Sequence, residues 1–308
     1  MRAPAKLAAY AVVLAVVTGG GAAVGAATGP IDVGGDEAHD THPGTEAPSA
    51  PAEPAGAAQT SGLPGGLAVA QAGYRLDVGG AAVPAGAPTT FAFGVLDEDG
   101  APVTRFDVEH EKRLHLVVVG RNLIDYAHVH PTMADDGTWS VELPALPAGS
   151  YRAFADFVPT GDDAVTLGVD LTVTGPTATA GLPEPSHHAS VDGYEVSLDG
   201  DATAGESALG FTVTLDGEAV RTDPYLGAAG HLVAIRAGDL AYLHVHPLDS
   251  EGDEVRFAAE FPSAGTYRLF LDFAHGGDVH TAAFTVEVPD RPTDTEAPAS
   301  DDGHDEGH

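Results

Sequence analysis

The chain has 308 residues, contains no cysteine and carries a formal net charge of −33, because 46 acidic residues outnumber 13 lysines and arginines. A charge of this sign repels nucleic acid and anionic lipid head groups, so neither is expected as a partner through electrostatics. Without cysteine the fold has no disulfide, and a metal site must use histidine, carboxylate or methionine ligands. The length suggests about two domains.

The N-terminal segment, residues 1–28, predicts export. Two basic residues precede an apolar run over 7–17, and small residues follow. This is the order of a secretory signal peptide, with cleavage expected after Ala26 or Ala27. The uncharged stretch 7–28 is also about long enough to span a bilayer, so an uncleaved membrane anchor is the alternative. In both cases the rest of the chain is expected outside the cytoplasm, secreted or in the cell envelope.

Low-complexity segments flank the central part of the chain. Residues 29–66 are rich in Pro, Ala, Gly, Thr and Glu and lack apolar periodicity, and residues 289–308 form an acidic tail that contains histidine. Both compositions are typical of disorder. A shorter proline-containing linker, 176–189, separates two units, 67–175 and 190–288.

The two units are copies of each other. Adding 116 to a position in the first unit gives its partner in the second, so the His-Val-His-Pro motif at 128–131 aligns with the one at 244–247. Residues 149–157 (GSYRAFADF) match residues 265–273 (GTYRLFLDF) at six of nine positions. This self-similarity indicates a duplicated domain of roughly 100 residues.

Each unit has the pattern of short β-strands separated by Gly, Pro and Asp turns. The first unit has apolar runs at 91–96, 114–119, 139–143, 151–158 and 165–173. The second has them at 211–215, 231–235, 255–261, 267–273 and 281–288. About seven short strands in a unit of this size favour a β-sandwich. The predicted fold is therefore all-β, with two tandem immunoglobulin-like β-sandwich domains.

Tyr151 helps to assign these strands. A Gly-x-Tyr sequence that opens a strand resembles the tyrosine corner at the start of strand F in immunoglobulin-like folds. On this assignment, 114–119 is strand C, and 126–130 is the strand C′ that forms a hairpin with it.

Three histidines of the first unit are expected to meet on one sheet face. His128 and His130 are two positions apart on a strand and therefore share a face. His115 lies on the preceding strand, and a turn near Asn122 brings it opposite them. Asp156, on the neighbouring strand F, is expected to face the same side. The corresponding residues of the second unit are His231, His244, His246 and Asp272.

Neutral imidazoles together with a carboxylate suit Cu(II) or Zn(II). Asp156 would be either a ligand or the residue that orients His115 through its other ring nitrogen. The alternative is structural, because histidines on strands are commonly held by hydrogen bonds to residues such as Tyr126. The sequence thus predicts either one divalent ion per unit or two hydrogen-bonded polar clusters.

The same sheet face is expected to be partly apolar. Val117, Val119 and Phe154 would share it with the polar cluster, which makes it too apolar to be fully solvated. Either the two units pack these faces against each other, or a partner protein covers them.

The segments 114–119 (LHLVVV), 126–131 (YAHVHP) and 149–157 resemble a group of exported bacterial proteins labelled heavy-metal-binding or YtkA-like. The resemblance covers both units and neither of the flanking arms. It implies an immunoglobulin-like β-sandwich and a role in metal handling at the cell envelope.

Together these observations predict a non-catalytic envelope protein that binds Cu(II) or Zn(II). The alternative is a surface-exposed structural or protein-interaction module, with an envelope protein as its partner. An enzyme is not expected, because the chain has no GxSxG, HExxH or phosphate-loop motif. The membrane would be a partner only through an uncleaved N-terminal segment.

Overall fold

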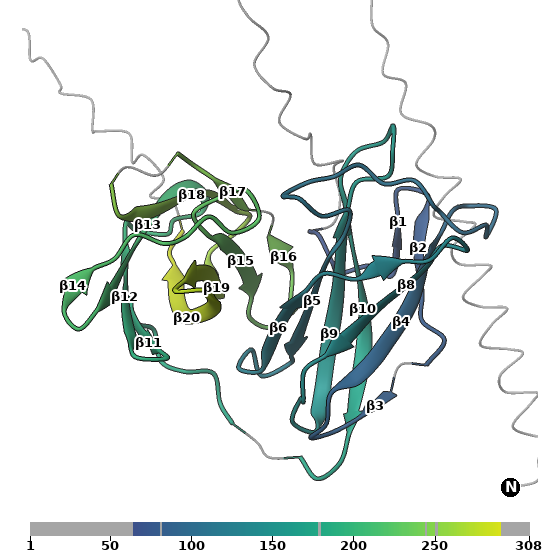
Figure 1. Ribbon diagram of the computed structural model, residues 1–308, viewed down its shortest axis with the longest axis horizontal. Helices are drawn as coiled ribbons and strands as arrows, with labels where there is room; N and C mark the ends of the chain where they lie inside the picture. The colour runs from purple at the N-terminus through teal and green to yellow at the C-terminus, as the bar shows by residue number, and fades with distance from the viewer. Residues whose placement is uncertain (1–63, 81, 178–179, 244, 250–251, 291–308) are drawn as a thin grey trace, which may run out of the picture. The chain divides into compact units, whose positions relative to one another are not determined.

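The computed structural model describes residues 64–80, 82–177, 180–243, 245–249 and 252–290 (Figure 1). These residues form strands, turns and loops. Within them, no helix is long and apolar enough to cross a membrane. The predicted signal or anchor segment, and nearly all of the two predicted arms, lie outside the described residues.

The first repeat is a sandwich of two five-stranded sheets (Figure 1). In order, the first sheet contains β1 (Ala70–Gln71), β2 (Tyr74–Asp77), β4 (Thr89–Leu96), β8 (Thr138–Leu143) and β7 (Thr132–Met133). The second contains β3 (Ala82–Pro84), β10 (Val165–Thr174), β9 (Gly149–Phe157), β5 (His115–Gly120) and β6 (Tyr126–Val129). Strand β3 pairs with β10 in parallel, and the other neighbours pair antiparallel.

The second repeat also has two sheets. The larger contains β11 (His188–Val191), β12 (Tyr194–Asp199), β13 (Gly205–Leu215), β18 (Glu254–Phe261) and β17 (Val245–Pro247), with β14 (Glu218–Ala219) paired to β13. The smaller contains β16 (Tyr242–Leu243), β15 (His231–Arg236), β19 (Gly265–His275) and β20 (Asp278–Val288).

Alternating side chains build a separate core inside each sandwich. On β4, Phe91 and Phe93 are buried, whereas Ala92 between them is exposed. On β13, Phe211 and Val213 enter the core of the second repeat in the same way. This alternation follows from the pleat of a strand, which sends successive side chains to opposite faces. The predicted all-β fold with two tandem sandwiches is confirmed.

Both repeats contain a tyrosine corner. The Tyr151 hydroxyl donates to the carbonyl of Pro147 at 2.8 Å, and the Tyr267 hydroxyl donates to the carbonyl of Ser263 at 2.9 Å. Each acceptor lies four residues upstream, as in the start of strand F of immunoglobulin-like folds. Strand β9 is therefore strand F, and β5 beside it is strand C, with β6 as C′.

A third apolar cluster joins the repeats, which belong to one compact unit of the chain. Its buried members come from both repeats: Val117, Val119, Leu123, Phe154, Val233, Ile235, Leu240, Tyr242 and Phe270. Tyr126 stacks on Phe270 with ring centroids 4.0 Å apart. In the equivalent contact, Tyr242 packs on Phe154 at 5.3 Å. Reciprocal contacts of this kind are expected for an interface with two-fold symmetry. The apolar outer faces therefore pack against each other, which was the first of the two alternatives.

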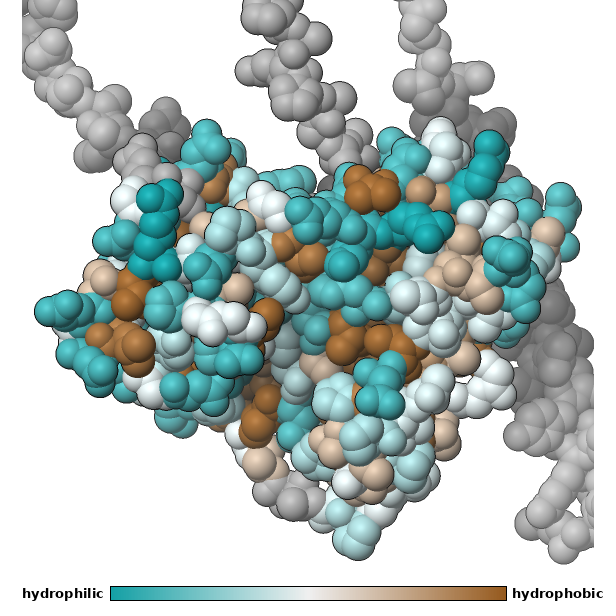
Figure 2. Space-filling model, in the orientation of Figure 1, coloured by the Kyte–Doolittle hydropathy of each residue, from teal (hydrophilic) through white to brown (hydrophobic). Residues whose placement is uncertain are grey.

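The surface retains few large apolar side chains. Among the described residues, the exposed ones are Val69, Val108, Leu248 and Val279. On the face drawn in Figure 2, apolar side chains form separate patches among hydrophilic ones. Most of the large apolar side chains are thus used in the two cores and in the junction cluster.

The chain just before the first repeat is structured, which corrects the predicted end of the linker 29–66. The N–H of Tyr242 donates to the carbonyl of Gly65 at 3.0 Å, and the N–H of Gly66 donates to the carbonyl of Thr166 at 2.9 Å. This segment therefore satisfies backbone groups at the exposed edges of β16 and β10. Backbone pairing of this kind leaves no side-chain pattern in the sequence.

The second repeat begins slightly before its predicted start. The strands of the second repeat run from His188 to Val288, so β11 begins inside the predicted linker 176–189. Strand β11 pairs with β12 through a tight turn in which Asp192 has a φ of 48°.

Candidate metal centre at the junction of the repeats

Three of the predicted ligands converge on one face of β5 and β6. Ligand nitrogens of His115, His128 and His130, one from each ring, all lie within 4.8 Å of one another. Strands β5 and β6 pair antiparallel with Val117 opposite His128. Continuing this register places His130 opposite His115, and the centroids of those two rings are 4.9 Å apart. We name these three histidines the triad.

The hairpin turn that sets this register is held by Asn122. Its side-chain oxygen accepts the N–H of Ile124 at 3.1 Å, and its amide donates to Asp125 at 3.3 Å. Asparagine commonly stabilises turns by bonding to backbone two residues ahead. The turn therefore returns the chain in the register that brings the triad together.

The hydrogen bonds of His115 and His128 determine which ring nitrogens face each other. Nε2 of His115 donates to the carbonyl of Glu109 at 3.2 Å. Nδ1 of His128 donates to the carboxylate of Asp272 at 2.8 Å. In neutral imidazoles, the remaining nitrogens, His115 Nδ1 and His128 Nε2, must then carry lone pairs. These two nitrogens are only 3.1 Å apart.

Two lone pairs at this distance repel each other unless a cation lies between them. A proton would make one ring an imidazolium, and a metal ion would bind both rings. Two nitrogens bound tetrahedrally to one Zn(II) lie about 3.4 Å apart, close to the distance between His115 Nδ1 and His128 Nε2. The spacing therefore suits a shared ion.

His130 supplies a third nitrogen. Its Nε2 atom is buried and has no hydrogen-bond partner among the described residues. Buried polar atoms in proteins are nearly always paired, so an unpaired one calls for a specific explanation. The ring of His130 lies 4.8 Å from that of His128, which makes this nitrogen available to an ion bound by the other two rings.

Burial keeps two triad rings in the form that binds metals. Burial lowers the pKa of His115 to about 4, and the nearby His128 ring adds to this effect. Burial likewise lowers the pKa of His130 to about 3. These two rings are therefore neutral at pH 7, and only a neutral imidazole nitrogen can bind a metal.

Asp272 reaches the triad from the second repeat. Its buried carboxylate accepts hydrogen bonds from His128 Nδ1, from the Tyr126 hydroxyl at 3.2 Å and from Thr281 Oγ1 at 2.5 Å. A carboxylate that accepts the other N–H of a ligating histidine fixes the tautomer and orientation of the ring. The sequence predicts Asp272 as a member of the second unit's set, and the structure places it opposite His231 and also against His128 of the first repeat.

Asp156 occupies the equivalent position in the first repeat. It lies opposite His115 in the pairing of β5 with β9, as predicted, but it is not one of the three clustered ligands. Its Oδ1 atom accepts the Thr166 hydroxyl at 2.8 Å. The matching residue of the second repeat, Asp272, accepts the Thr281 hydroxyl in the same way.

The structure does not assemble the second predicted set among the described residues. His231 is buried opposite Asp272 on β15 and β19, as predicted. His246, however, lies on β17, which pairs with β18 of the other sheet, and it is exposed. The reason is that Val245 already pairs with Ala259 of β18, whereas its counterpart Val129 still pairs with Leu116 of β5. His244 lies outside the described residues.

Sequence reasoning missed His110. Its ring centroid lies 5.0 Å from that of His231 and 6.1 Å from that of His115. The residue sits in a loop before β5, so no strand periodicity connected it with the other histidines.

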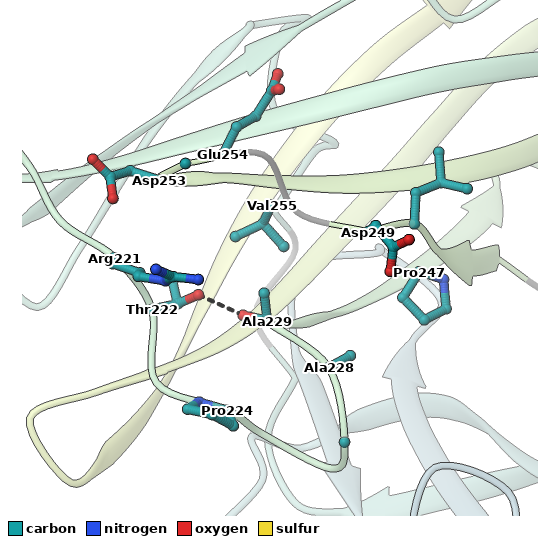
Figure 3. A pocket seen from close by; sticks show the side chains of 13 residues that line it. Arg221, Thr222, Pro224, Ala228, Ala229, Pro247, Asp249, Asp253, Glu254 and Val255 are labelled. Carbon is teal, nitrogen blue, oxygen red and sulfur yellow. Dashed lines mark hydrogen bonds between the residues drawn. The ribbon is translucent and has the colours of Figure 1, made fainter.

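A pocket of about 540 Å³ lies in the second repeat (Figure 3). Its lining includes Arg221, Asp253 and Glu254, and none of the predicted ligands borders it. In Figure 3 the Thr222 hydroxyl donates to the carbonyl of Ala229, at 2.7 Å. Among the described residues, the only group of three potential metal ligands is the triad, which is therefore the better candidate for a metal site.

Several solved structures show similarity to this chain. The Escherichia coli adhesin FdeC is 17% identical, with a TM-score of 0.22, and the match covers 70% of this chain and 64% of that one. For Yersinia pseudotuberculosis InvD the identity is 13% and the TM-score 0.24, with coverages of 73% and 60%. A two-domain fibronectin type III segment of chicken tenascin is 12% identical, with a TM-score of 0.22 and coverages of 69% and 97%. The chain thus spans less than two thirds of the first two proteins, and these similarities carry no inference about function.

A comparison with curated proteins finds no match. A family model described as a domain of unknown function, DUF8832, matches residues 68–175 and 189–290. The two matches together cover more than half of the chain and coincide with the two sandwiches. The chain therefore belongs to the DUF8832 family and carries two copies of its domain.

Proposed function

We propose that this protein is an exported, non-catalytic module that binds one Cu(II) or Zn(II) ion at the junction of its two repeats. The ligands would be His115 Nδ1, His128 Nε2 and His130 Nε2. Asp272 of the second repeat would orient His128. A set of three imidazoles without a thiol matches the ligands that these two ions prefer.

The main support for the proposal is the short distance between two ring nitrogens that both carry lone pairs. His115 Nδ1 and His128 Nε2 are 3.1 Å apart, while the other nitrogen of each ring already donates to an oxygen. The buried, unpaired Nε2 of His130 adds a third donor on the same side. The net charge of −33 further favours a cation. The resemblance to heavy-metal-binding envelope proteins agrees with this proposal.

Calorimetric titration of the full chain with Cu(II) and Zn(II) tests it. We expect a tight, stoichiometric binding event in the wild type that His128→Ala removes. His246→Ala is the matched control, because His246 is an exposed histidine on β17 and its loss leaves the triad intact. Histidines of the N- and C-terminal arms are the same in every variant, so any contribution from them cancels in the comparison. Equal binding by the wild type and His128→Ala would refute the proposal.

A specific observation favours a second function, that of a structural or protein-interaction module. Asp272 ties the repeats together by accepting hydrogen bonds from His128 and Tyr126. If a proton replaces the metal, His128 becomes an imidazolium that donates to both Asp272 and His115. The cluster would then be a hydrogen-bonded support for the junction.

Thermal unfolding with and without metal separates the two functions. A bound ion stabilises the folded state by about 2.7 kcal/mol when its free concentration is 100 times the dissociation constant. A structural cluster predicts no such gain, although His128→Ala would still lower the melting temperature. A metal-induced rise that is absent from His128→Ala supports the metal site.

A further inference from the structure

Two short turns of identical construction lie beside the triad, one in each repeat. In the first repeat, Glu109 and Lys112 exchange two backbone hydrogen bonds of 2.9 Å. In the second, Tyr225 and Ala228 exchange bonds of 2.8 and 3.2 Å. The pairs are related by the same 116-residue shift as the histidines. The carbonyl of Glu109 accepts from His115, just as the carbonyl of Tyr225 accepts from His231.

The central residues of the two turns differ, although their backbone conformations are alike. Leu226 and Gly227 have φ values of 52° and 78°, and His110 and Glu111 have φ values of 46° and 64°. Two-residue turns with positive φ at both positions favour sequences such as Asn-Gly. The second repeat provides the expected glycine, whereas the first uses two residues with side chains. His110 and Leu226 share the positive φ of the first position, so the difference there is the side chain, an imidazole in the first repeat and an aliphatic group in the second.

The His110 ring meets a histidine from the other repeat. Its centroid is 5.0 Å from that of His231, and the two ring planes are nearly perpendicular. Nε2 of His231 donates to the carbonyl of Tyr225 at 3.2 Å, so Nδ1 carries the lone pair of the neutral ring. This is the arrangement already seen in His115.

The spacing of this pair lies within the range found in the triad. The centroids of the triad rings are 5.3, 4.9 and 4.8 Å apart. Two imidazoles bound tetrahedrally to one ion at about 2 Å have centroids about 5 Å apart. The separation of 5.0 Å between His110 and His231 therefore also suits a shared ion.

We propose that His110 and His231 form a second binding position for Cu(II) or Zn(II), completed by water, next to the triad. This inference rests on the proposed function of the triad. The His231 ring lies 6.1 Å from that of His115 and 6.4 Å from that of His128, so the two positions are neighbours. Five imidazoles from both repeats would then hold two ions, the triad binding the tighter one.

The test uses His110→Asn in the full chain. Asparagine adopts positive φ more readily than most residues, so this variant preserves the turn while it removes the imidazole. His188→Asn is the control, because His188 is an exposed histidine at the start of β11. Each protein is titrated with Zn(II) by calorimetry. Each is also loaded with Cu(II) and measured by electron paramagnetic resonance, in which two neighbouring ions give a half-field signal that isolated ions in the arms do not.

We expect the wild type and His188→Asn to bind a tight ion and a weaker one and to give the half-field signal. His110→Asn should weaken the second ion about tenfold or more, lose the signal and retain the tight ion. If His110→Asn matches the wild type while His128→Ala loses the tight ion, the second position is refuted and the triad site stands. If His110→Asn weakens the tight ion at unchanged stoichiometry, His110 is a ligand of the first ion and the second position is also refuted. If neither variant changes binding, both proposals fail.

Discussion

Replacing Asp272 with asparagine perturbs the proposed site with little change of shape. The Asp272 side chain is almost fully buried, with 3% exposure, and accepts hydrogen bonds from His128, Tyr126 and Thr281. Asparagine has one oxygen acceptor and an amide group that only donates. His128 would therefore face either the amide nitrogen, which cannot accept, or an uncharged amide oxygen, which is a weaker acceptor than the carboxylate.

The size of the effect follows from the role of the carboxylate. Loss of such a partner of a metal-bound histidine weakens metal binding about 10- to 100-fold. This corresponds to about 1.4–2.7 kcal/mol of binding free energy. The metal-free protein should also lose about 1–3 kcal/mol of unfolding free energy, because the hydrogen bonds to a buried, charged acceptor are lost or weakened.

Zn(II) titration of the wild type, Asp272→Asn and Asp156→Asn measures this effect. Asp156 is the matched control, because it occupies the equivalent position in the first repeat, opposite His115, and also accepts a threonine hydroxyl. We expect weaker binding only for Asp272→Asn. Wild-type affinity in Asp272→Asn would refute the reasoning, as would an equal loss in Asp156→Asn, since that would assign the orienting role to Asp156.

Three further predictions concern stability. Acidification from pH 6.5 towards pH 4 should destabilise the protein, because burial holds the pKa of His115 near 4 and that of His130 near 3, so the unfolded chain binds more protons. Each ring contributes up to about 1.4 kcal/mol of unfolding free energy per pH unit. Equal unfolding free energies from urea denaturation at pH 7 and pH 5 would contradict this prediction. Tyr151→Phe should cost about 1 kcal/mol by removing the tyrosine-corner hydrogen bond, and an unchanged guanidinium midpoint would argue against that role. Phe270→Ala should cost about 3–5 kcal/mol and uncouple the repeats, so that Trp139 fluorescence and circular dichroism give separate unfolding transitions. Coincident transitions at the wild-type midpoint would contradict this.

The sequence predicted the features that depend on local pattern. Strands such as β4 and β9 follow from alternating apolar residues between turn residues. The triad could be located because His128 and His130 share a strand face and because a short hairpin fixes the position of His115. The apolar residues on the outer sheet face correctly predicted that this face is buried. Packing between the two repeats was one of the two explanations offered for it.

The sequence could not predict features that depend on how the repeats meet. Exact duplication implied two equal sites, whereas the junction brings Asp272 of the second repeat to His128 of the first. His246 lies on the other sheet because Val245 pairs with β18, whereas its counterpart Val129 pairs with β5, and the shared His-Val-His-Pro motif does not reveal this difference. His110 is positioned by an unusual turn, which its residue types do not favour.

Anomalous diffraction from crystals of the protein grown with Zn(II) or Cu(II) tests the central claim most directly. The account predicts a strong anomalous peak about 2.0–2.1 Å from His115 Nδ1 and His128 Nε2, within reach of His130. His128 Nδ1 would remain bonded to Asp272. No peak at the triad, with His128 Nε2 still in hydrogen-bond contact with His115 Nδ1, would contradict the metal site and favour a proton shared within a structural cluster.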